Sequence, residues 1–287
     1  DHLDPELELQ EISQFVGGQS NPTFLLRCAG AMYVLRKKPP GKLLPSAHMV
    51  EREHRVRAAL ADTKVPVPPM RLLCEDPDVI GTAFYVMDYI EGRVYTDPVA
   101  PDLSNADRAQ VYDDLAVIMA ALHQVEPLVV GLGDFGKPTG YTQRQFAVWT
   151  RQYEAYKTEE LEGMNQLHHW LEANLPQSEE TTVIHGDYRL GNVMLDPVDP
   201  KIVAVLDWEL STLGNPLVDL AHCCLSYYIP AGSGQYPGLA GADLAAMQIP
   251  SETQFLQSYF AARGVEAPEN WPFYMAFALY RMAAICQ

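Results

Sequence analysis

The residues of this chain best suited to chemistry lie in the segment His185-Gly-Asp-Tyr-Arg-Leu-Gly-Asn192. A short apolar run, Val183-Ile184, delivers Asp187 onto a loop that also carries Asn192, and a later apolar run ends at Asp207. Phosphoryl transfer needs such a set, because one carboxylate accepts the proton of the attacking hydroxyl while an Asn oxygen and a second carboxylate hold magnesium against a triphosphate. The pattern therefore predicts a phosphotransferase site. The alternative is that both Asp residues only cap turns at strand ends.

The elements that must position these residues fall into two parts, divided where Glu91-Gly92 breaks the chain. In the first part we expect a helix from about Ser46 to Leu60 and strands at 24–27, 32–36, 70–74 and 82–89. In the second part we expect helices at 104–124, 142–157 and 160–174 and short strands at 181–184, 192–195 and 202–206. The sequence therefore predicts an α+β fold with one domain over residues 1–91 and another over 92–287.

The composition narrows the classes of function. The 287 residues are 48% hydrophobic and 20% charged, which is typical of a globular chain. Asp and Glu outnumber Lys and Arg by 37 to 20, and this excess of acid argues against nucleic acid as a partner. No apolar run approaches the ~20 residues of a membrane span, so no membrane partner is expected. The five cysteines form no C-x-x-C pair, which indicates reduced thiols and a cytoplasmic protein. The oligomeric state stays open.

The catalytic segment resembles that of aminoglycoside phosphotransferases and the wider choline kinase-like superfamily. Three further segments look more narrowly like the kinase-like domain joined to some acyl-CoA dehydrogenases and its free-standing bacterial relatives. They are Gly18-Gln-Ser-Asn-Pro-Thr23, residues 34–41 with 44–48, and residues 208–216. The resemblance covers residues 12–287. It implies a bilobal protein-kinase-like fold, with an antiparallel N-lobe sheet and one helix over 1–91 and a mainly helical C-lobe over 92–287. It also implies ATP and Mg²⁺ as cofactors.

The resemblance also implies which residues contact the phosphates. The candidates in the phosphate-covering loop are Gly17, Gly18, Gln19, Ser20 and Asn21. Arg36 stands where the family has a Lys that contacts the α- and β-phosphates, although a one-residue shift would direct Lys37 inward instead. Glu53 is expected to orient this base. Glu51 is its competitor, because the two lie about 200° apart on a helix and only one can point inward.

Residues 84–92 resemble the strand that becomes the hinge between the lobes. Adenine would bond to the carbonyl of Asp88 and the N–H of Ile90. Met87 would stand behind the purine, or fill the core. Within the catalytic loop, the resemblance assigns the base to Asp187 and places Arg189 near the transferred phosphate.

The same resemblance assigns the metal to Asn192 and Asp207, with Glu209 as a possible further contact. Asp219 is similar to a structural Asp that braces the catalytic loop, and His185 is expected to organise that loop from a buried position.

The resemblance implies a small hydroxylated acceptor, for which two classes stay open. A hydroxyacyl-CoA-like metabolite, slightly favoured, would need bases to bind its phosphates. The candidates are Lys38, Lys42, Arg144 and Arg151. A polycationic aminoglycoside would instead suit the acidic C-lobe, including Glu159, Glu160 and Glu162. A third hypothesis is a nucleotide-binding regulator without transfer activity.

Overall fold

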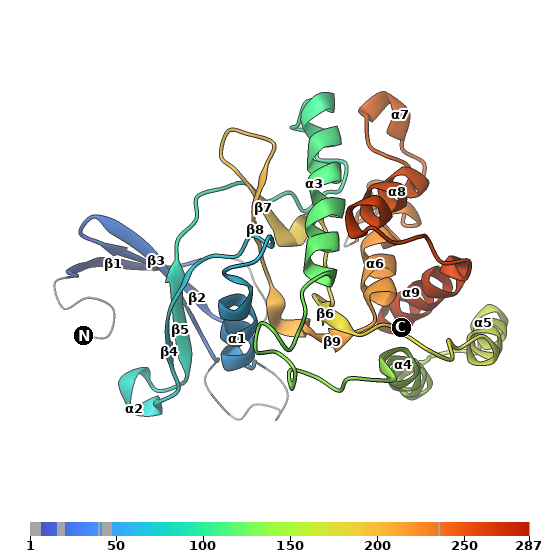
Figure 1. Cartoon of the computed structure of the whole chain (residues 1–287), viewed down its shortest axis with the longest axis horizontal. Helices are drawn as coiled ribbons and strands as arrows, with labels where there is room; N and C mark the ends of the chain where they lie inside the picture. Colours follow the sequence, from blue (N-terminus) through green and yellow to red (C-terminus); the bar gives the residue numbers. More distant parts are fainter. Residues whose placement is uncertain (1–6, 16–20, 40, 42–47, 235, 287) are drawn as a thin grey trace.

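The first part of the chain forms one five-stranded antiparallel sheet (Figure 1). The computed structural model describes residues 7–15, 21–39, 41, 48–234 and 236–286. The strand order is β1-β2-β3-β5-β4, with β1 (Leu9–Gln14), β2 (Thr23–Cys28), β3 (Ala31–Lys37), β4 (Met70–Cys74) and β5 (Phe84–Asp88). A single-turn helix, α2 (Pro77–Ile80), connects β4 to β5. We did not predict β1, because most of its residues are exposed and it lacks the apolar alternation of a half-buried strand.

The predicted strands at 24–27 and 32–36 are confirmed as β2 and β3, which pair as a hairpin. Cys28 pairs with Ala31 and Thr23 with Arg36, so only a two-residue turn separates the strands. Gly30 in this turn has a φ of 81°, a left-handed conformation that glycine adopts without steric cost. The register carries Arg36 to the end of β3, where it is paired with Tyr85 of β5.

One helix, α1 (Val50–Leu60), lies between the sheet and the helical part of the molecule (Figure 1). The predicted start near Ser46 is wrong: the helix begins at Val50, and Met49 offers its N-terminus no side-chain hydrogen bond. Ser46 itself lies outside the described residues. The buried face of α1 includes Val50, Glu53, Val56, Arg57 and Leu60. A carboxylate therefore sits among apolar residues on the side that faces the sheet.

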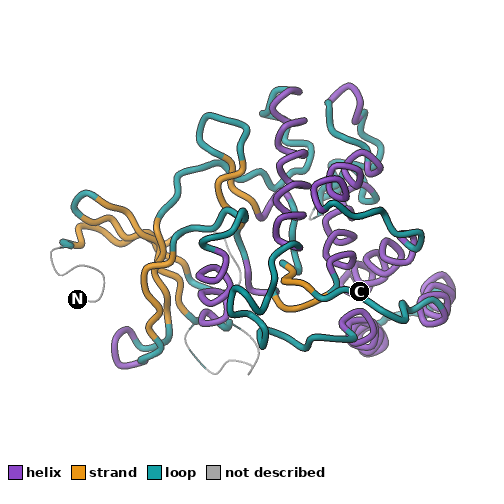
Figure 2. The backbone as a smooth tube through the Cα atoms, viewed as in Figure 1, coloured by secondary structure: helices purple, strands orange, loops and turns teal. Residues whose placement is uncertain are grey.

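The second part of the chain is mainly helical (Figure 2). The predicted helices are confirmed as α3 (Asn105–His123), α4 (Tyr141–Tyr156) and α5 (Glu162–Ala173). Ser104 caps α3 by accepting the N–H of Asp107. The later helices are α6 (Pro216–Cys224), α7 (Leu244–Met247), α8 (Glu252–Arg263) and α9 (Trp271–Cys286). Among the described residues, no helix has the length and apolar character needed to span a membrane.

Two short strand pairs flank the residues that the sequence predicts to be catalytic. The expected strands are confirmed as β6 (Thr182–Ile184), β7 (Val193–Leu195) and β8 (Ile202–Val205). β7 pairs with β8, and β6 pairs with β9 (Thr212–Gly214), which we did not predict. Short 3₁₀ turns lie at Leu190–Asn192, before β7, at Trp208–Leu210, before β9, and at Leu225–Tyr227, after α6.

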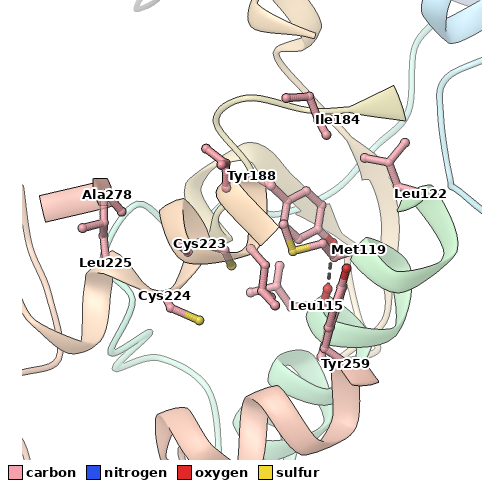
Figure 3. Close-up of a cluster of buried hydrophobic side chains, with 14 of the residues drawn as sticks. Leu115, Met119, Leu122, Ile184, Tyr188, Cys223, Cys224, Leu225, Tyr259 and Ala278 are labelled. Carbon is pink, nitrogen blue, oxygen red and sulfur yellow. Dashed lines mark hydrogen bonds between the residues drawn. The ribbon is translucent and has the colours of Figure 1, made fainter. Parts of the chain in front are cut away.

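The main hydrophobic core lies beneath these strand pairs and anchors the catalytic segment. Figure 3 shows Tyr188 packed beside Leu115 and Met119 of α3, with Tyr259 of the neighbouring helix α8 close by. Tyr188 is fully buried, and its hydroxyl donates to the carbonyl of Leu115 at 3.0 Å. The residue directly after Asp187 is therefore fixed in the core, which restricts the loop on which Asp187 lies.

Candidate active site

The loop that carries Asp187 is held by the main chain. Gly186 has a φ of 88°, and a Cβ there would lie 2.8 Å from the carbonyl oxygen of Leu210, so only glycine fits. Asp219 of α6 accepts the N–H groups of His185 and Gly186, each at 2.8 Å. Its carboxylate also lies 3.2 Å from Nε2 of His123. Asp219 thus braces the turn into the loop, in the position that the resemblance implied.

Asp219 is charged although it is buried. Burial by itself would raise the pKa of this carboxyl, but the hydrogen bond and charge of His123, with the N–H of His185, lower the pKa overall. The hydrogen bonds thus outweigh the cost of removing the carboxylate from water.

His185 links the same loop to the end of β8. Its Nδ1 accepts the N–H of Asp187 at 3.2 Å, and its Nε2 lies 2.7 Å from the carbonyl of Leu206. The ring must therefore carry its proton on Nε2, and burial lowers the pKa of His185 in favour of this neutral form. The predicted role of His185 as a buried organiser matches these contacts. The link connects the turn before Asp187 to Leu206, which lies between the end of β8 and Asp207.

Three side chains hold the carboxylate of Asp187. Asn192 donates from Nδ2 to both the carbonyl oxygen and Oδ2 of Asp187, each at 2.7 Å. On the other side, Nε2 of His222 lies 2.8 Å from Oδ1, and Nε of Arg189 lies 3.5 Å from the same oxygen. Burial acts to raise the pKa of Asp187, but the bond to His222 and the nearby charges lower it well below its usual range. Asp187 is therefore an oriented, ionised carboxylate at neutral pH.

Asn192 and Asp207 present oxygen atoms suited to magnesium. Because the amide nitrogen of Asn192 donates to Asp187, its Oδ1 points away from that carboxylate and is available to a metal. Its carbonyl accepts the N–H of Leu206 at 2.8 Å, which ties it to the residue before Asp207. Asp207 has a left-handed backbone with a φ of 57°. Its Oδ1 is buried and accepts no hydrogen bond in the described part of the chain, although NH2 of Arg36 lies 3.5 Å away. A carboxylate oxygen that accepts no hydrogen bond and an amide oxygen are both ligands that a hard cation prefers.

A cluster of charged side chains lies on the sheet side of Asp207. Nε of Arg36 lies 3.1 Å from Glu53, and its NH2 lies 3.5 Å from Asp207 and 3.8 Å from Glu209. Burial alone would lower the pKa of Arg36, but these carboxylates, Glu53 foremost, raise it overall. Of the two registers that the sequence left open, the structure brings Arg36 to Glu53.

Glu53, which is 1% exposed, is the residue of α1 that faces this cluster. It accepts hydrogen bonds from Asn21 at 2.8 Å and from the hydroxyl of Tyr85 at 2.9 Å. Its competitor Glu51 instead pairs with Lys38 at 2.9 Å. Lys38 is therefore engaged by a carboxylate, which weakens its expected role in binding phosphates.

The remaining predicted nucleotide residues are only partly described. Gly17, Gly18, Gln19 and Ser20 lie outside the described residues, as does Lys42. Met87 is buried and its sulfur accepts a hydrogen bond from Arg57 at 3.1 Å, so it is a core residue as well as a candidate purine contact. Asp88 binds Arg71 through both carboxylate oxygens at 2.6 Å, which leaves its main chain and that of Ile90 as the hinge candidates.

A cleft of about 330 Å³ opens beside Asp187. It is lined by the side chains of Asp187, Arg189, His222 and Arg281 together with Leu210, Leu225, Ile229, Tyr236, Met282 and Ile285, among others. A smaller apolar recess of about 60 Å³ shares Arg189 and Cys223 with this cleft and continues toward Tyr112 and Phe255. The expected bases Arg144 and Arg151 are not among the lining residues. The cleft is thus largely apolar, with two guanidinium groups.

Sequence reasoning missed His222 and Arg281 as site residues. His222 follows Asp219 by three positions on α6, so the shared helix face was a usable signal. Arg281 interrupts the apolar sequence of α9. Its guanidinium lies 5.2 Å from the ring centre of Trp149 and donates to the carbonyl of Gly186 at 3.4 Å. A single charged residue in an otherwise apolar helix could likewise have indicated a site residue.

The fold is that of a known class. The sequence profile of the phosphotransferase enzyme family matches residues 11–268. The chain therefore belongs to that family, and its architecture is the kinase-like one that the resemblance implied.

Three relatives show how the similarity is distributed. Acyl-CoA dehydrogenase family member 10 of Mus musculus is 44% identical over 277 residues, which cover 96% of this chain but 26% of the mouse protein. The chain thus spans about a quarter of that relative. A crystal structure from Ralstonia eutropha, provisionally assigned as an aminoglycoside phosphotransferase, has 44% identity and a TM-score of 0.90 over 99% of this chain and 84% of that one. The streptomycin–ATP–APH(2″)-IIa ternary complex shares the fold at 18% identity and a TM-score of 0.61, covering 94% of this chain and 82% of that one.

Proposed function

We propose that this protein transfers the γ-phosphate of ATP to a hydroxyl group of a small molecule. The observation that carries the proposal is the carboxylate of Asp187, which is ionised, held on both oxygens and placed in the wall of an open cleft. Oxygen ligands for a metal follow on the same loop and at the end of β8. Such a set matches the requirements of phosphoryl transfer, which depends on placement and charge more than on covalent chemistry.

In this mechanism, Asp187 accepts a hydrogen bond from the acceptor hydroxyl. The hydroxyl oxygen forms a bond to the γ-phosphorus as the bond from that phosphorus to the bridging oxygen breaks, and ADP leaves. The hydroxyl proton passes to Asp187. Because the pKa of Asp187 is lowered, we expect it to orient the hydroxyl and to receive the proton late in the reaction. Arg189, half exposed beside it, would offset the charge on the transferred phosphate.

The N-lobe, which we place at residues 1–91, would hold the nucleotide against the C-lobe of residues 92–287. Arg36 is oriented by the buried Glu53 and would contact the phosphates, while the main chain at Asp88 and Ile90 would bind adenine. Magnesium would be held by Asn192 and Asp207, and when bound it neutralises charge on the phosphates. In the part of the chain that the structure describes, no group of three or more His, Cys, Asp or Glu could hold a metal.

For the acceptor, we propose a hydroxyacyl-CoA-like metabolite. The cleft offers guanidinium groups of Arg189 and Arg281 for an anion and apolar side chains for an acyl chain. Asp187 is the one carboxylate among its described lining residues, whereas a polycationic aminoglycoside needs several. The kinship with a protein named acyl-CoA dehydrogenase family member 10 adds support from outside the geometry. The nucleotide-binding regulator is disfavoured because Asp187, Asn192 and Asp207 are all present and held in order.

The test is ADP formation from ATP and Mg²⁺ with a chain-length series of hydroxyacyl-CoAs beside kanamycin. We expect kcat/KM to rise with acyl length, since each buried CH₂ contributes about 0.8 kcal/mol. The variant R281Q should weaken every acyl-CoA substrate, whereas K201Q, at an exposed position before β8, should not. Turnover of kanamycin with no response to any acyl-CoA would contradict the acyl-CoA proposal and favour an aminoglycoside as the acceptor.

A further inference from the structure

His222 contacts the carboxylate on which the proposed reaction depends, from a helix far along the chain. Its Nε2 lies 2.8 Å from Oδ1 of Asp187, and its side chain is 15% exposed. An ionised carboxylate can only accept, so the proton must lie on Nε2 of the histidine. Nδ1 is buried and has no hydrogen-bond partner in the described part of the chain. The ring is thus directed to Asp187 and to no second polar group described here.

The other two donors to this carboxylate are less suited to orient it. Asn192 binds Oδ2, but the same side chain would also have to hold magnesium. Arg189 lies 3.5 Å away on a side chain that is 52% exposed, and it would be drawn to the transferred phosphate. His222 combines a short contact with low exposure, and its Nδ1 has no hydrogen-bond partner in the described part of the chain. It is therefore the donor best able to keep Oδ1 in place throughout a reaction cycle.

The helix α6 holds the loop at two successive points. Asp219 accepts the main-chain N–H groups of His185 and Gly186, and His222, one turn later on the same face, binds the side chain of Asp187. Asn215 caps the start of α6 by accepting the N–H of Leu217, so the helix itself is fixed at its N-terminus. The main chain and the side chain of the loop are thus aligned by one rigid element.

We propose that His222 is a positioning residue for phosphoryl transfer: it fixes the plane of the Asp187 carboxylate so that the lone pairs not used by Asn192 and His222 face the acceptor hydroxyl. The inference rests on the proposed function. Without this contact the carboxylate can rotate about its Cβ–Cγ bond, and a small misplacement of a reacting group is costly in rate. Removal of the imidazole should lower kcat and leave the binding of ATP and Mg²⁺ unchanged.

The experiment compares H222A, H222Q and D187N with the double variant D187N/H222A. ADP formation from ATP and Mg²⁺ is followed with 3-hydroxyhexanoyl-CoA and with water as the only acceptor, so that the comparison does not depend on one acceptor. H222A should lose about 10- to 100-fold in kcat at unchanged KM for ATP. H222Q places an amide N–H at a similar reach and should recover most of the rate. H169Q, at an exposed histidine of α5, is the matched control.

The double variant separates positioning from a general structural effect. Once Asp187 is replaced there is no carboxylate to orient, so H222A should cost nothing further in the D187N background. An equal loss in both backgrounds, an H222Q variant as slow as H222A, or a fall in ATP affinity that follows a fall in Tm would each overturn the inference. If D187N is slow while H222A matches the parent, only the inference fails. If the parent forms no more ADP than D187N, the proposed function itself fails.

Discussion

Asp219 is the residue whose neutralisation tests most directly how the catalytic loop is built. In D219N the side chain keeps one acceptor oxygen and gains an amide group. One carboxylate oxygen of Asp219 accepts only the N–H of Gly186, whereas the other accepts from both His185 and His123. The least costly orientation of the D219N side chain therefore places its amide nitrogen near Gly186, whose N–H is left unpaired. The remaining oxygen still faces His185 and His123. An orphaned buried N–H costs about 1–3 kcal/mol, and two bonds that lose a charged acceptor each weaken by about 1 kcal/mol. We therefore expect D219N to lower the free energy of unfolding by about 3–5 kcal/mol.

The sign of this expectation follows from the pKa of Asp219. The pKa is lowered although burial opposes it, so the hydrogen bonds contribute more than desolvation costs, and removal of the charge is a net loss. The assay is urea unfolding followed by near-UV circular dichroism, with D113N at an exposed position of α3 as the control within about 0.5 kcal/mol of the parent. A loss below about 1 kcal/mol for D219N would refute the reasoning, because the three donors would then have other partners.

Three further predictions follow from the same geometry. D187N should cut kcat by about 10²–10⁴ and leave ATP affinity nearly intact in calorimetry; equal turnover would remove Asp187 from the mechanism. D207A should abolish the magnesium dependence of nucleotide binding, measured by titration with and without Mg²⁺, and an unchanged dependence would contradict the assignment. Folding lowers the pKa of Asp219 below the ~3.9 of an unfolded Asp. The contribution of this carboxylate to the free energy of unfolding is therefore complete well above pH 4 and is lost as the pH falls below 4. The stability gap between parent and D219N should therefore narrow as the pH falls below about 4, and a constant gap would show that Asp219 does not titrate in this way.

Much of the architecture could be predicted from local patterns in the chain. The hairpin of β2 and β3, the strands β6 to β8 and the helices α3 to α5 all lie where apolar periodicity and capping residues indicated them. These signals are local, since a strand or helix is specified mainly by its own residues and their immediate flanks. The strands β1 and β9 were missed because one is exposed along most of its length and the other has three residues.

The grouping of Asp187 and Asn192 could be predicted because one short loop carries both residues. Which neighbours complete the site depended on how distant elements pack. Helical periodicity showed that Glu51 and Glu53 oppose each other, but only the packing of α1 against the sheet turned Glu53 toward Arg36. His222 and Arg281 reach the loop from α6 and α9, and no pattern within either helix states which loop it faces. Sequence spacing thus determined which reactive side chains the catalytic loop carries. Which charged groups from other elements meet them was decided by the burial of apolar helix faces against one core, because this packing sets the rotation of each helix about its axis.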